Sequence, residues 1–182
     1  MQNNTELDFA VFNLDFFQNK IGDLNQRFNK YYNTTKEYLH SFLNDNPPWA
    51  INCLIWKKES FEKIGMFDEN FWIMDDPELH TRSILYNLKF KVFSNYPSDC
   101  FYRISYSNKN STNQFYTDSI VGRIKYYKKI YSLILTQNQQ KLIPHIKKGI
   151  RTVFRKWFFA HYKNNEIIIN GFLQWLKANK LL

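Results

Sequence analysis

The sequence predicts an α/β fold that is followed by an α-helical C-terminal region. Between residues 7 and 105, short apolar runs of strand length alternate with segments of helical pattern, an order that is typical of α/β proteins. After about residue 113 the apolar residues recur at helical spacing, with one break at Pro144. The chain of 182 residues is 44% hydrophobic and 19% aromatic, which is enough for a buried core. We therefore predict an α/β unit over residues 1–111 and a helical extension over residues 112–182.

The first half of the α/β unit contains a predicted strand, a helix and a second strand. Residues 7–13, LDFAVFN, are mostly apolar and are bounded by polar residues. Residues 35–43 have a helical pattern, which ends at the run 44–48, NDNPP, because the residue before a proline disfavours helical dihedral angles. The apolar run 50–56 has the length of a buried strand.

The second half of the unit contains two predicted helices and two predicted strands. Residues 59–64 form a short helix, and Gly65 suits the left-handed cap at its end. Asp76-Pro77 predicts the next helix start, since the carboxylate can cap free N–H groups and proline fits the first helical position. This helix is expected to run to about residue 87 and to bury Leu79, Ile84, Leu85 and Leu88. Residues 90–93 and 100–105 are predicted strands, and residues 107–113 a polar loop.

The net charge of +9 belongs mainly to the C-terminal third of the chain. Between Asp118 and Glu166 there is no acidic residue, whereas lysines and arginines are frequent. This imbalance indicates an anionic partner, namely a phosphate, an acidic lipid or a nucleic acid.

Residues 143–158 have the pattern of an amphipathic helix with a basic flank. The apolar residues recur at helical spacing, and Lys147, Lys148, Arg151 and Arg155 gather along one side. One interpretation is a helix that lies on an anionic membrane surface. The other is a helix that packs its apolar stripe on the domain and exposes its basic face to water.

The sequence indicates a cytoplasmic protein. Its first residues, MQNNTELD, are polar and acidic, unlike a signal peptide, and no run of 18 apolar residues could span a bilayer. Cys53 and Cys100 lie in apolar runs, where a reduced cysteine behaves as a small hydrophobic residue. The basic flank at 143–158 would allow peripheral contact with the inner face of the membrane.

Asp75 and Asp76 are the first candidates for chemistry, because two adjacent carboxylates repel each other. The repulsion raises the proton affinity of one of them and suits it to act as a base. A structural role is the alternative, with Asp76 as the N-cap and Asp75 in a favourable position for the helix dipole. Both roles are compatible, since a capping carboxylate keeps one oxygen free.

A second group of candidates lies in the turn after Gly65. Asp68 and Glu69 are typical turn residues, because aspartate hydrogen-bonds to nearby backbone N–H groups. The aromatic and apolar neighbours are expected to pack this turn onto the core, with an aromatic edge that lines a pocket; they are Met66, Phe67, Phe71 and Trp72.

Arg103 and the histidines are weaker candidates. Arg103, in the strand CFYRIS, could reach a phosphate, or it could be exposed or ion-paired on its strand. His80, His145 and His161 have no ligand partner at helical spacing, so structural or surface roles are expected and no metal site is predicted. The sequence has no Gly-rich phosphate loop, no GxSxG, no HExxH and no D-x-D.

Residues 49–111 resemble the acceptor half of family-2 glycosyltransferases of the GT-A fold. In that family an apolar strand leads to a short helix, an iGgFDE-like turn, an acidic pair that opens an arginine-containing helix, and a later Tyr-Arg strand with a Ser-rich loop. The matching segments here are 51–56, 61–64, 65–69, Asp75-Asp76 with Arg82, and Tyr102-Arg103 with residues 105–111.

The resemblance implies a partial GT-A-like mixed sheet and gives roles to single residues. Asp76 matches the general base that takes a proton from the acceptor hydroxyl as its oxygen attacks the anomeric carbon of a nucleotide-sugar. Asp75 matches the variable acidic neighbour of that base. Arg103 matches a position that faces the leaving diphosphate. The residues that match the acceptor side are Asp68, Glu69 and Trp72.

The chain departs from the pattern of the family in one respect. The family binds the nucleotide through an earlier half that ends in D-x-D and holds Mn²⁺ or Mg²⁺. We therefore expect an acceptor-binding portion that holds no metal by itself. The complete enzyme would use the metal, a nucleotide-sugar and a saccharide or lipid-linked acceptor in bacterial surface polysaccharide synthesis. Two alternatives stay open: a non-catalytic remnant or interaction module, and a basic nucleic-acid-binding protein, which the core-like patterns of the aromatic residues disfavour.

Overall fold

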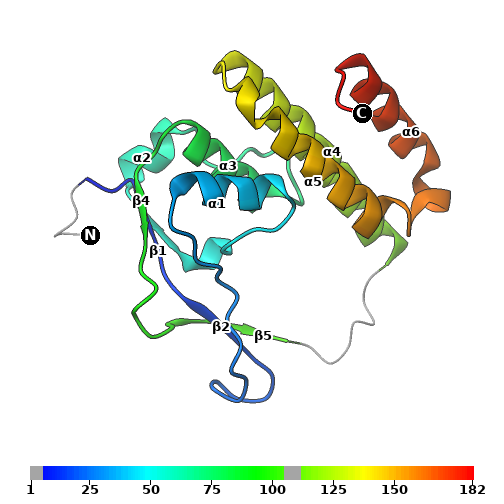
Figure 1. Ribbon diagram of the computed structural model, residues 1–182. Helices are drawn as coiled ribbons and strands as arrows, with labels where there is room; N and C mark the ends of the chain where they lie inside the picture. Colours follow the sequence, from blue (N-terminus) through cyan, green and yellow to red (C-terminus); the bar gives the residue numbers. More distant parts are fainter. Residues whose placement is uncertain (1–5, 105–111) are drawn as a thin grey trace.

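The computed structural model describes residues 6–104 and 112–182. In Figure 1 the strands lie at the lower left, helices lie above them, and the C-terminal helices form the right-hand side. The arrangement confirms the predicted class, with small mixed sheets, helices and a helical C-terminal region. Within the described ranges, no helix is both long enough and apolar enough to cross a bilayer. Residues 105–111, which include most of the predicted polar loop and the Ser-rich loop of the resemblance, lie outside the described residues.

The main sheet has three strands in the order β3–β1–β4. The central strand β1, Phe9–Val11, is fully buried; it pairs antiparallel with β3, Leu54–Trp56, and parallel with β4, Phe90–Val92. The Phe9 ring stacks on Trp56 and on Phe90, with ring centroids 4.4 and 5.0 Å apart, and these cross-strand pairs stabilise the register. Among the described residues β3 and β4 pair only with β1, so each is an edge strand.

A second pair of strands forms a parallel ribbon beside the main sheet. It consists of β2, Leu14–Phe17, and β5, Cys100–Arg103. The chain bends between β1 and β2, so the predicted strand 7–13 ends at Val11. Buried Asn29 holds this bend, because its Oδ1 accepts the N–H of Leu14 at 2.8 Å.

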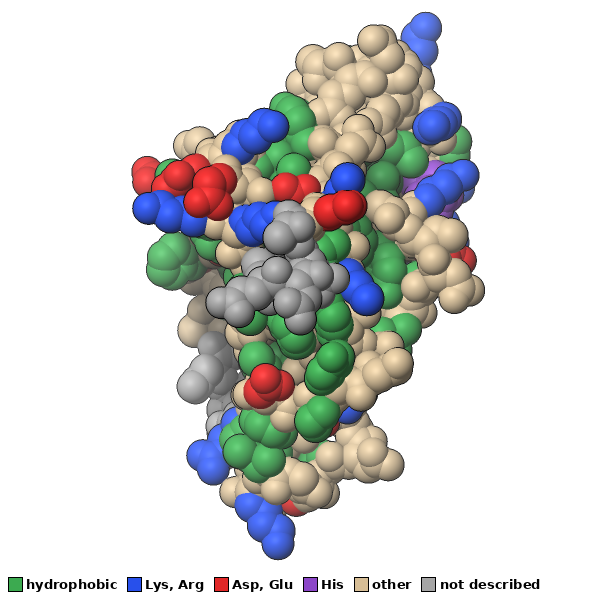
Figure 2. All heavy atoms as spheres, turned by 90° about the vertical axis from the view of Figure 1, so that its left-hand side faces the viewer, with side chains coloured by type: hydrophobic (Ala, Val, Ile, Leu, Met, Phe, Trp, Pro, Cys, Tyr) green, Lys and Arg blue, Asp and Glu red, His purple; other side chains and the backbone are tan. Residues whose placement is uncertain are grey.

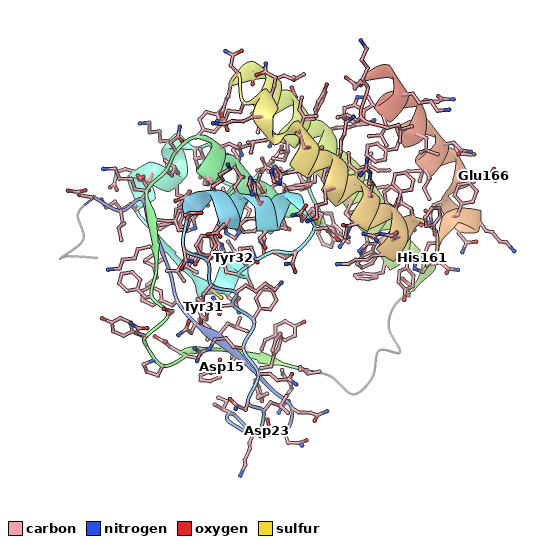
Figure 3. The ribbon with its side chains drawn as sticks, viewed as in Figure 1. Asp15, Asp23, Tyr31, Tyr32, His161 and Glu166 are labelled. Atoms are coloured by element: carbon pink, nitrogen blue, oxygen red, sulfur yellow. The ribbon has the colours of Figure 1, made fainter. Side chains whose placement is uncertain are left out.

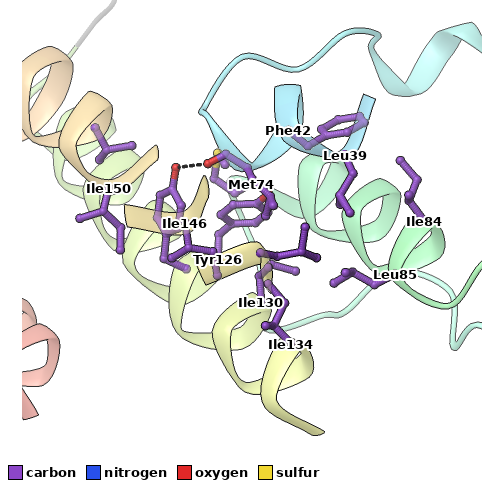
Figure 4. Close-up of a cluster of buried hydrophobic side chains, with 14 of the residues drawn as sticks. Leu39, Phe42, Met74, Ile84, Leu85, Tyr126, Ile130, Ile134, Ile146 and Ile150 are labelled. Carbon is purple, nitrogen blue, oxygen red and sulfur yellow. Dashed lines mark hydrogen bonds between the residues drawn. The ribbon is translucent and has the colours of Figure 1, made fainter. Parts of the chain in front are cut away.

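Helices α1, Thr35–Leu43, and α3, Asp75–Leu85, pack against each other above the sheet (Figure 1). A capping box starts α1, since the side chains of Thr34 and Glu37 each bond to the backbone N–H of the other residue. Figure 4 shows the core that these helices share with the C-terminal helices. Its labelled residues are Leu39, Phe42, Met74, Ile84, Leu85, Tyr126, Ile130, Ile134, Ile146 and Ile150.

The C-terminal region consists of three α-helices, a 3₁₀ turn at Gln140–Leu142 and a π-helical turn. Helix α4 spans Asn113–Thr136 and contacts α3, and α5 spans Ile143–Val153 and contacts α1. The π-helical turn η4, Phe154–Phe158, continues α5, and α6 spans Tyr162–Ala178. Because α4 and α5 pack directly on the helices of the α/β unit, the helical region completes the core.

Gly149 allows α5 to approach the end of α1 closely. A Cβ atom at this position would lie 1.8 Å from the carbonyl oxygen of Leu43. That same oxygen accepts a hydrogen bond from the Tyr127 hydroxyl at 3.1 Å. Only glycine fits here without moving the backbone, because two helices and a buried hydrogen bond meet at one point.

Several element boundaries differ from the predictions. The run 50–56 is not one strand, since Ile51–Cys53 form a 3₁₀ turn before β3. Helix α2 spans Lys58–Lys63, and Gly65 has the predicted left-handed conformation with φ of 89°. Helix α3 begins at Asp75, so the prediction that Asp76 is its N-cap is wrong. Met74 is the N-cap, with φ of 75°, and its side chain makes no capping bond.

Candidate functional site

Asp75 and Asp76 form the first turn of α3, at the edge of the sheet where β1 ends. Val11, the last residue of β1, pairs with Leu54, and the turn Ile51–Cys53 directly precedes Leu54. The main-chain N–H of Ile51 donates a hydrogen bond to the Asp76 carboxylate. Ligands of open α/β sheets bind beside the carboxyl ends of strands, so Asp76 lies at the edge where a ligand is expected.

The surroundings of Asp76 raise its pKa from 3.8 to about 6. Partial burial of the carboxyl group is the largest cause, and the charge of Asp75 adds to it, while the hydrogen bond from Ile51 opposes both. A carboxylate with a pKa in this range accepts a proton at neutral pH more readily than an ordinary aspartate does. The sequence predicted a raised pKa from the adjacency of Asp75 alone, but burial contributes more to the shift than that charge does.

The segment that leads into α3 is held by tertiary contacts. Met66 and Met74, near its two ends, both have positive φ angles, of 51° and 75°, which cost free energy in a residue with a side chain. Helix α4 closes over the segment at Gly122, where a Cβ atom would lie 2.6 Å from the carbonyl oxygen of Ile73. The position of Asp75 and Asp76 thus depends on packing against α4.

Glu78 and Arg82 form a buried ion pair one turn further along α3. Arg82 Nε lies 2.7 Å from Glu78 Oε1, and Arg82 Nη2 lies 2.9 Å from Oε2, so the contact is bidentate. The guanidinium also donates to the carbonyl oxygens of Ile64 and Met66. This pair joins α3 to the turn after α2.

Lys129 of α4 extends the ion pair into a network. Its ammonium group lies 2.7 Å from Glu78 Oε1 and 2.6 Å from Asp68 Oδ2. The Lys129 hydrogen bond, together with N–H groups of Asn70, lowers the pKa of Asp68 to about 2. Asp68 therefore stabilises the turn as a permanent anion, which is the turn-forming role that its sequence position predicts.

Sequence reasoning missed Glu78 and Lys129. The spacing of Glu78 and Arg82 at i and i+4 on one helix was an available signal. Nothing local indicated Lys129, because it lies 61 residues from its partner Asp68.

Glu69 and Trp72 lie at the surface of the protein and not in its core. The expectation that Met66, Phe67 and Trp72 pack the turn onto the core is wrong, because their exposed fractions are 49%, 39% and 87%. Phe71 packs against the core as expected, and the ion-pair network anchors the turn while Phe67 and Trp72 stay exposed. Trp72 lies at a small hollow that it shares with Ile73 and Lys125, and the Glu69 side chain is exposed.

Arg103 lies at the end of β5, on the exposed side of the ribbon. Its guanidinium group lies over the Phe17 ring, 5.3 Å from the centroid. The contact that the structure describes for Arg103 is therefore with β2, and Arg103 is not brought into contact with Asp75 or Asp76.

Other carboxylates have structural partners elsewhere. Figure 3 shows Asp15 and Asp23 at the bottom of the molecule, and Glu166 on α6 at the right. Asp15 pairs with Arg27 at 2.7 Å, and Asp23 accepts backbone N–H groups in a turn. These residues do not join the acidic pair of α3.

His80 has a structural position in the core, as predicted. It is completely buried, and the rings of Phe42, Trp49 and Trp56 surround it. Neither ring nitrogen has a hydrogen-bond partner among the described residues. Burial lowers the pKa of His80 from 6.5 to about 3, so His80 is neutral in the folded protein.

Lowering the pH is expected to destabilise the fold through His80. The unfolded chain takes up a proton near pH 6.5 and the folded chain only near pH 3. The stability that neutral His80 provides is complete above pH 6.5 and falls as the pH drops, by up to roughly 1.4 kcal/mol per pH unit. Urea unfolding between pH 7 and pH 4.5 measures this slope. A His80→Leu variant should lose most of this pH dependence of stability. An unchanged slope in that variant would contradict the role given to His80.

The acidic residues of α3 are not joined by further metal-ligand side chains in the described ranges. Asp75 and Asp76 are adjacent acids, but in the two described ranges no cluster of three or more His, Cys, Asp or Glu side chains could bind a metal.

Comparison with protein-family models, with curated proteins and with solved structures finds no match to this chain.

Proposed function

We propose that this chain supplies the acceptor side of a family-2 glycosyltransferase, with Asp76 as the general base. The observation that carries the proposal is the half-buried Asp76 carboxyl, whose pKa is raised to about 6 at the carboxyl-end edge of the sheet. The order of motifs from residue 49 to Arg103 supports it independently.

In the proposed reaction, Asp76 accepts the proton of the acceptor hydroxyl. The oxygen then forms a bond to the anomeric carbon of the nucleotide-sugar, and the bond from that carbon to the diphosphate oxygen breaks. The nucleoside diphosphate leaves with the bonding electron pair. Asp75 assists by keeping the proton affinity of Asp76 high, and the ion-pair network of Glu78 fixes the helix that carries both.

The acceptor is proposed to lie over the turn that contains Glu69 and Trp72. Trp72 offers an apolar face to solvent, and Glu69 offers a carboxylate for hydroxyl groups. Arg103 is a proposed contact for the leaving diphosphate, since its side chain is exposed and permanently charged.

Saccharide binding to the chain tests this assignment. Titration with a panel of oligosaccharides and lipid-linked saccharides, followed by NMR, is expected to shift the Trp72 indole N–H signal and the backbone signals of residues 72–76. A Trp72→Ala variant should weaken the binding. Shifts confined to other regions, or binding unchanged by Trp72→Ala, would contradict the proposed acceptor site.

A further inference from the structure

A groove lies between α5 with its following turn and the C-terminal end of α6. Its volume is about 620 Å³. Figure 1 shows the C-terminus of the chain between these two helices. The apolar lining comes from Ile150, Phe154, Phe159, Leu173, Leu181 and Leu182.

The groove lining shares Ile150 with the apolar stripe of α5 but extends beyond it to exposed residues. The stripe packs inside the protein, since Ile146, Ile150, Val153 and Phe158 are at most 3% exposed. This is the second of the two arrangements that the sequence allows for residues 143–158. Phe159 and Leu182 in the groove are 70% and 59% exposed. Large apolar side chains gathered at an open groove indicate a binding surface.

Four cations line the same groove: Lys147, Lys148, Arg151 and Arg155. Lys147, Arg151 and Arg155 follow each other at i, i+4 spacing, where like charges repel. Among the described residues none of the four forms an ion pair with a carboxylate. In contrast, Figure 2 shows the side of the molecule that carries β4 and α2, where acidic and basic side chains are interspersed. The groove therefore combines an apolar lining with uncompensated positive charge.

We propose that this groove binds an anionic phospholipid at a bilayer surface. A segment of one acyl chain fills the apolar lining, and the phosphate contacts the cations of α5. Nucleic acid would satisfy the cations and leave the aliphatic lining unfilled. This inference is independent of the glycosyltransferase proposal.

Binding to vesicles tests the inference. The chain is expected to float with vesicles of phosphatidylglycerol and phosphatidylcholine, more weakly at high salt, and not with phosphatidylcholine alone. Changing Lys147, Lys148, Arg151 and Arg155 together to Gln should weaken the binding by roughly 100-fold or more, because each cation near an anionic surface adds to the affinity. Phe159→Ser with Leu182→Ser should weaken it by roughly tenfold while the charge is unchanged.

The matched control removes four exposed lysines outside the groove lining, Lys20, Lys63, Lys141 and Lys163. It has the same net charge as the groove variant and should keep the groove-dependent part of the binding. Circular dichroism melting establishes that each variant is folded. Equal losses in the control and the groove variant would overturn the inference. So would full competition by inorganic phosphate, or tighter binding to duplex DNA that the Phe159 and Leu182 changes leave unaltered.

Discussion

Asp76→Asn is expected to stabilise the fold at pH 7. The pKa of Asp76 is raised from 3.8 to about 6 in the folded protein, mainly by burial and then by the charge of Asp75. Stability from a raised pKa is fully present below pH 3.8 and is lost as the pH rises through 6, so at pH 7 the ionised carboxylate opposes folding. The carboxyl group is only half-buried, and solvent screens its charge. Replacing it by the amide is therefore expected to raise the free energy of unfolding by about 1–2 kcal/mol.

Denaturant unfolding at several pH values measures this gain. The difference between Asp76→Asn and the wild type should be largest near pH 7 and should disappear below pH 3.8, where the Asp76 carboxyl is protonated in both the folded and the unfolded protein. Asp75→Asn is the matched control, since it keeps the Asp76 carboxyl and removes the charge that raises its pKa. A destabilised Asp76→Asn at pH 7 would show that the carboxylate stabilises the fold instead.

The same variant is expected to lower the rate of sugar transfer strongly. In a protein that joins this chain to a nucleotide-binding half with D-x-D, loss of the base should lower kcat by 10²- to 10⁴-fold, as is typical for loss of acid–base catalysis. Asp75→Asn should retain much of the rate, with its pH dependence moved to lower pH. Measured transfer at the wild-type rate by Asp76→Asn would refute the assigned base. Higher stability together with lost activity would be the behaviour expected of a functional site.

Glu78→Ala is expected to have the largest effect on stability. The Glu78 side chain is inaccessible to solvent and bonds to both Arg82 and Lys129. Its removal leaves a buried guanidinium and a half-buried ammonium with too few partners, which costs about 3–5 kcal/mol. Urea unfolding at pH 7 measures the loss.

Glu62→Ala is the matched control for Glu78→Ala. Glu62 also pairs with a cation four residues away, Lys58, but the two side chains are exposed and 3.8 Å apart. Such surface pairs contribute about 0–1 kcal/mol, so the control should unfold at nearly the wild-type urea concentration. Similar losses in both variants would mean that burial of the Glu78 network contributes little to stability.

The Glu78 network also connects stability to the site. Arg82 holds the turn after α2, and Lys129 joins α4 to Asp68 in that turn. The turn leads to Met74 and the acidic pair. A weakened network is therefore expected to displace Asp75 and Asp76 before the whole protein unfolds.

Much of the α/β architecture could be predicted because it depends on local patterns. The helix over 35–43 could be predicted from its capping residues and from the prolines beyond it. The left-handed conformation of Gly65 could be predicted from its position after α2. The helix start at Asp75 is two residues earlier than predicted, because Met74 and not Asp76 takes the N-cap position, with a positive φ angle. That conformation needs the support of α4, which no local pattern indicates.

Asp75 and Asp76 could be selected as candidates from their adjacency alone. The burial of Asp76 and its hydrogen bond from the Ile51 N–H could not be predicted from the sequence. Both depend on how the chain returns to the end of β1. Trp72 looked like a core residue by its type, but the Asp68–Lys129 contact anchors the turn and leaves Trp72 in solvent.

The sequence by itself determined the class of fold, most of its elements but not β2, and the acidic pair that opens a helix. These features arise from neighbouring residues, whose spacing and backbone preferences act within a few positions along the chain. Only the tertiary structure decided which acid has a raised pKa, which side chains form the buried ion network, and which apolar residues line the C-terminal groove. These depend on contacts between residues far apart in sequence, where burial and charge are set by packing.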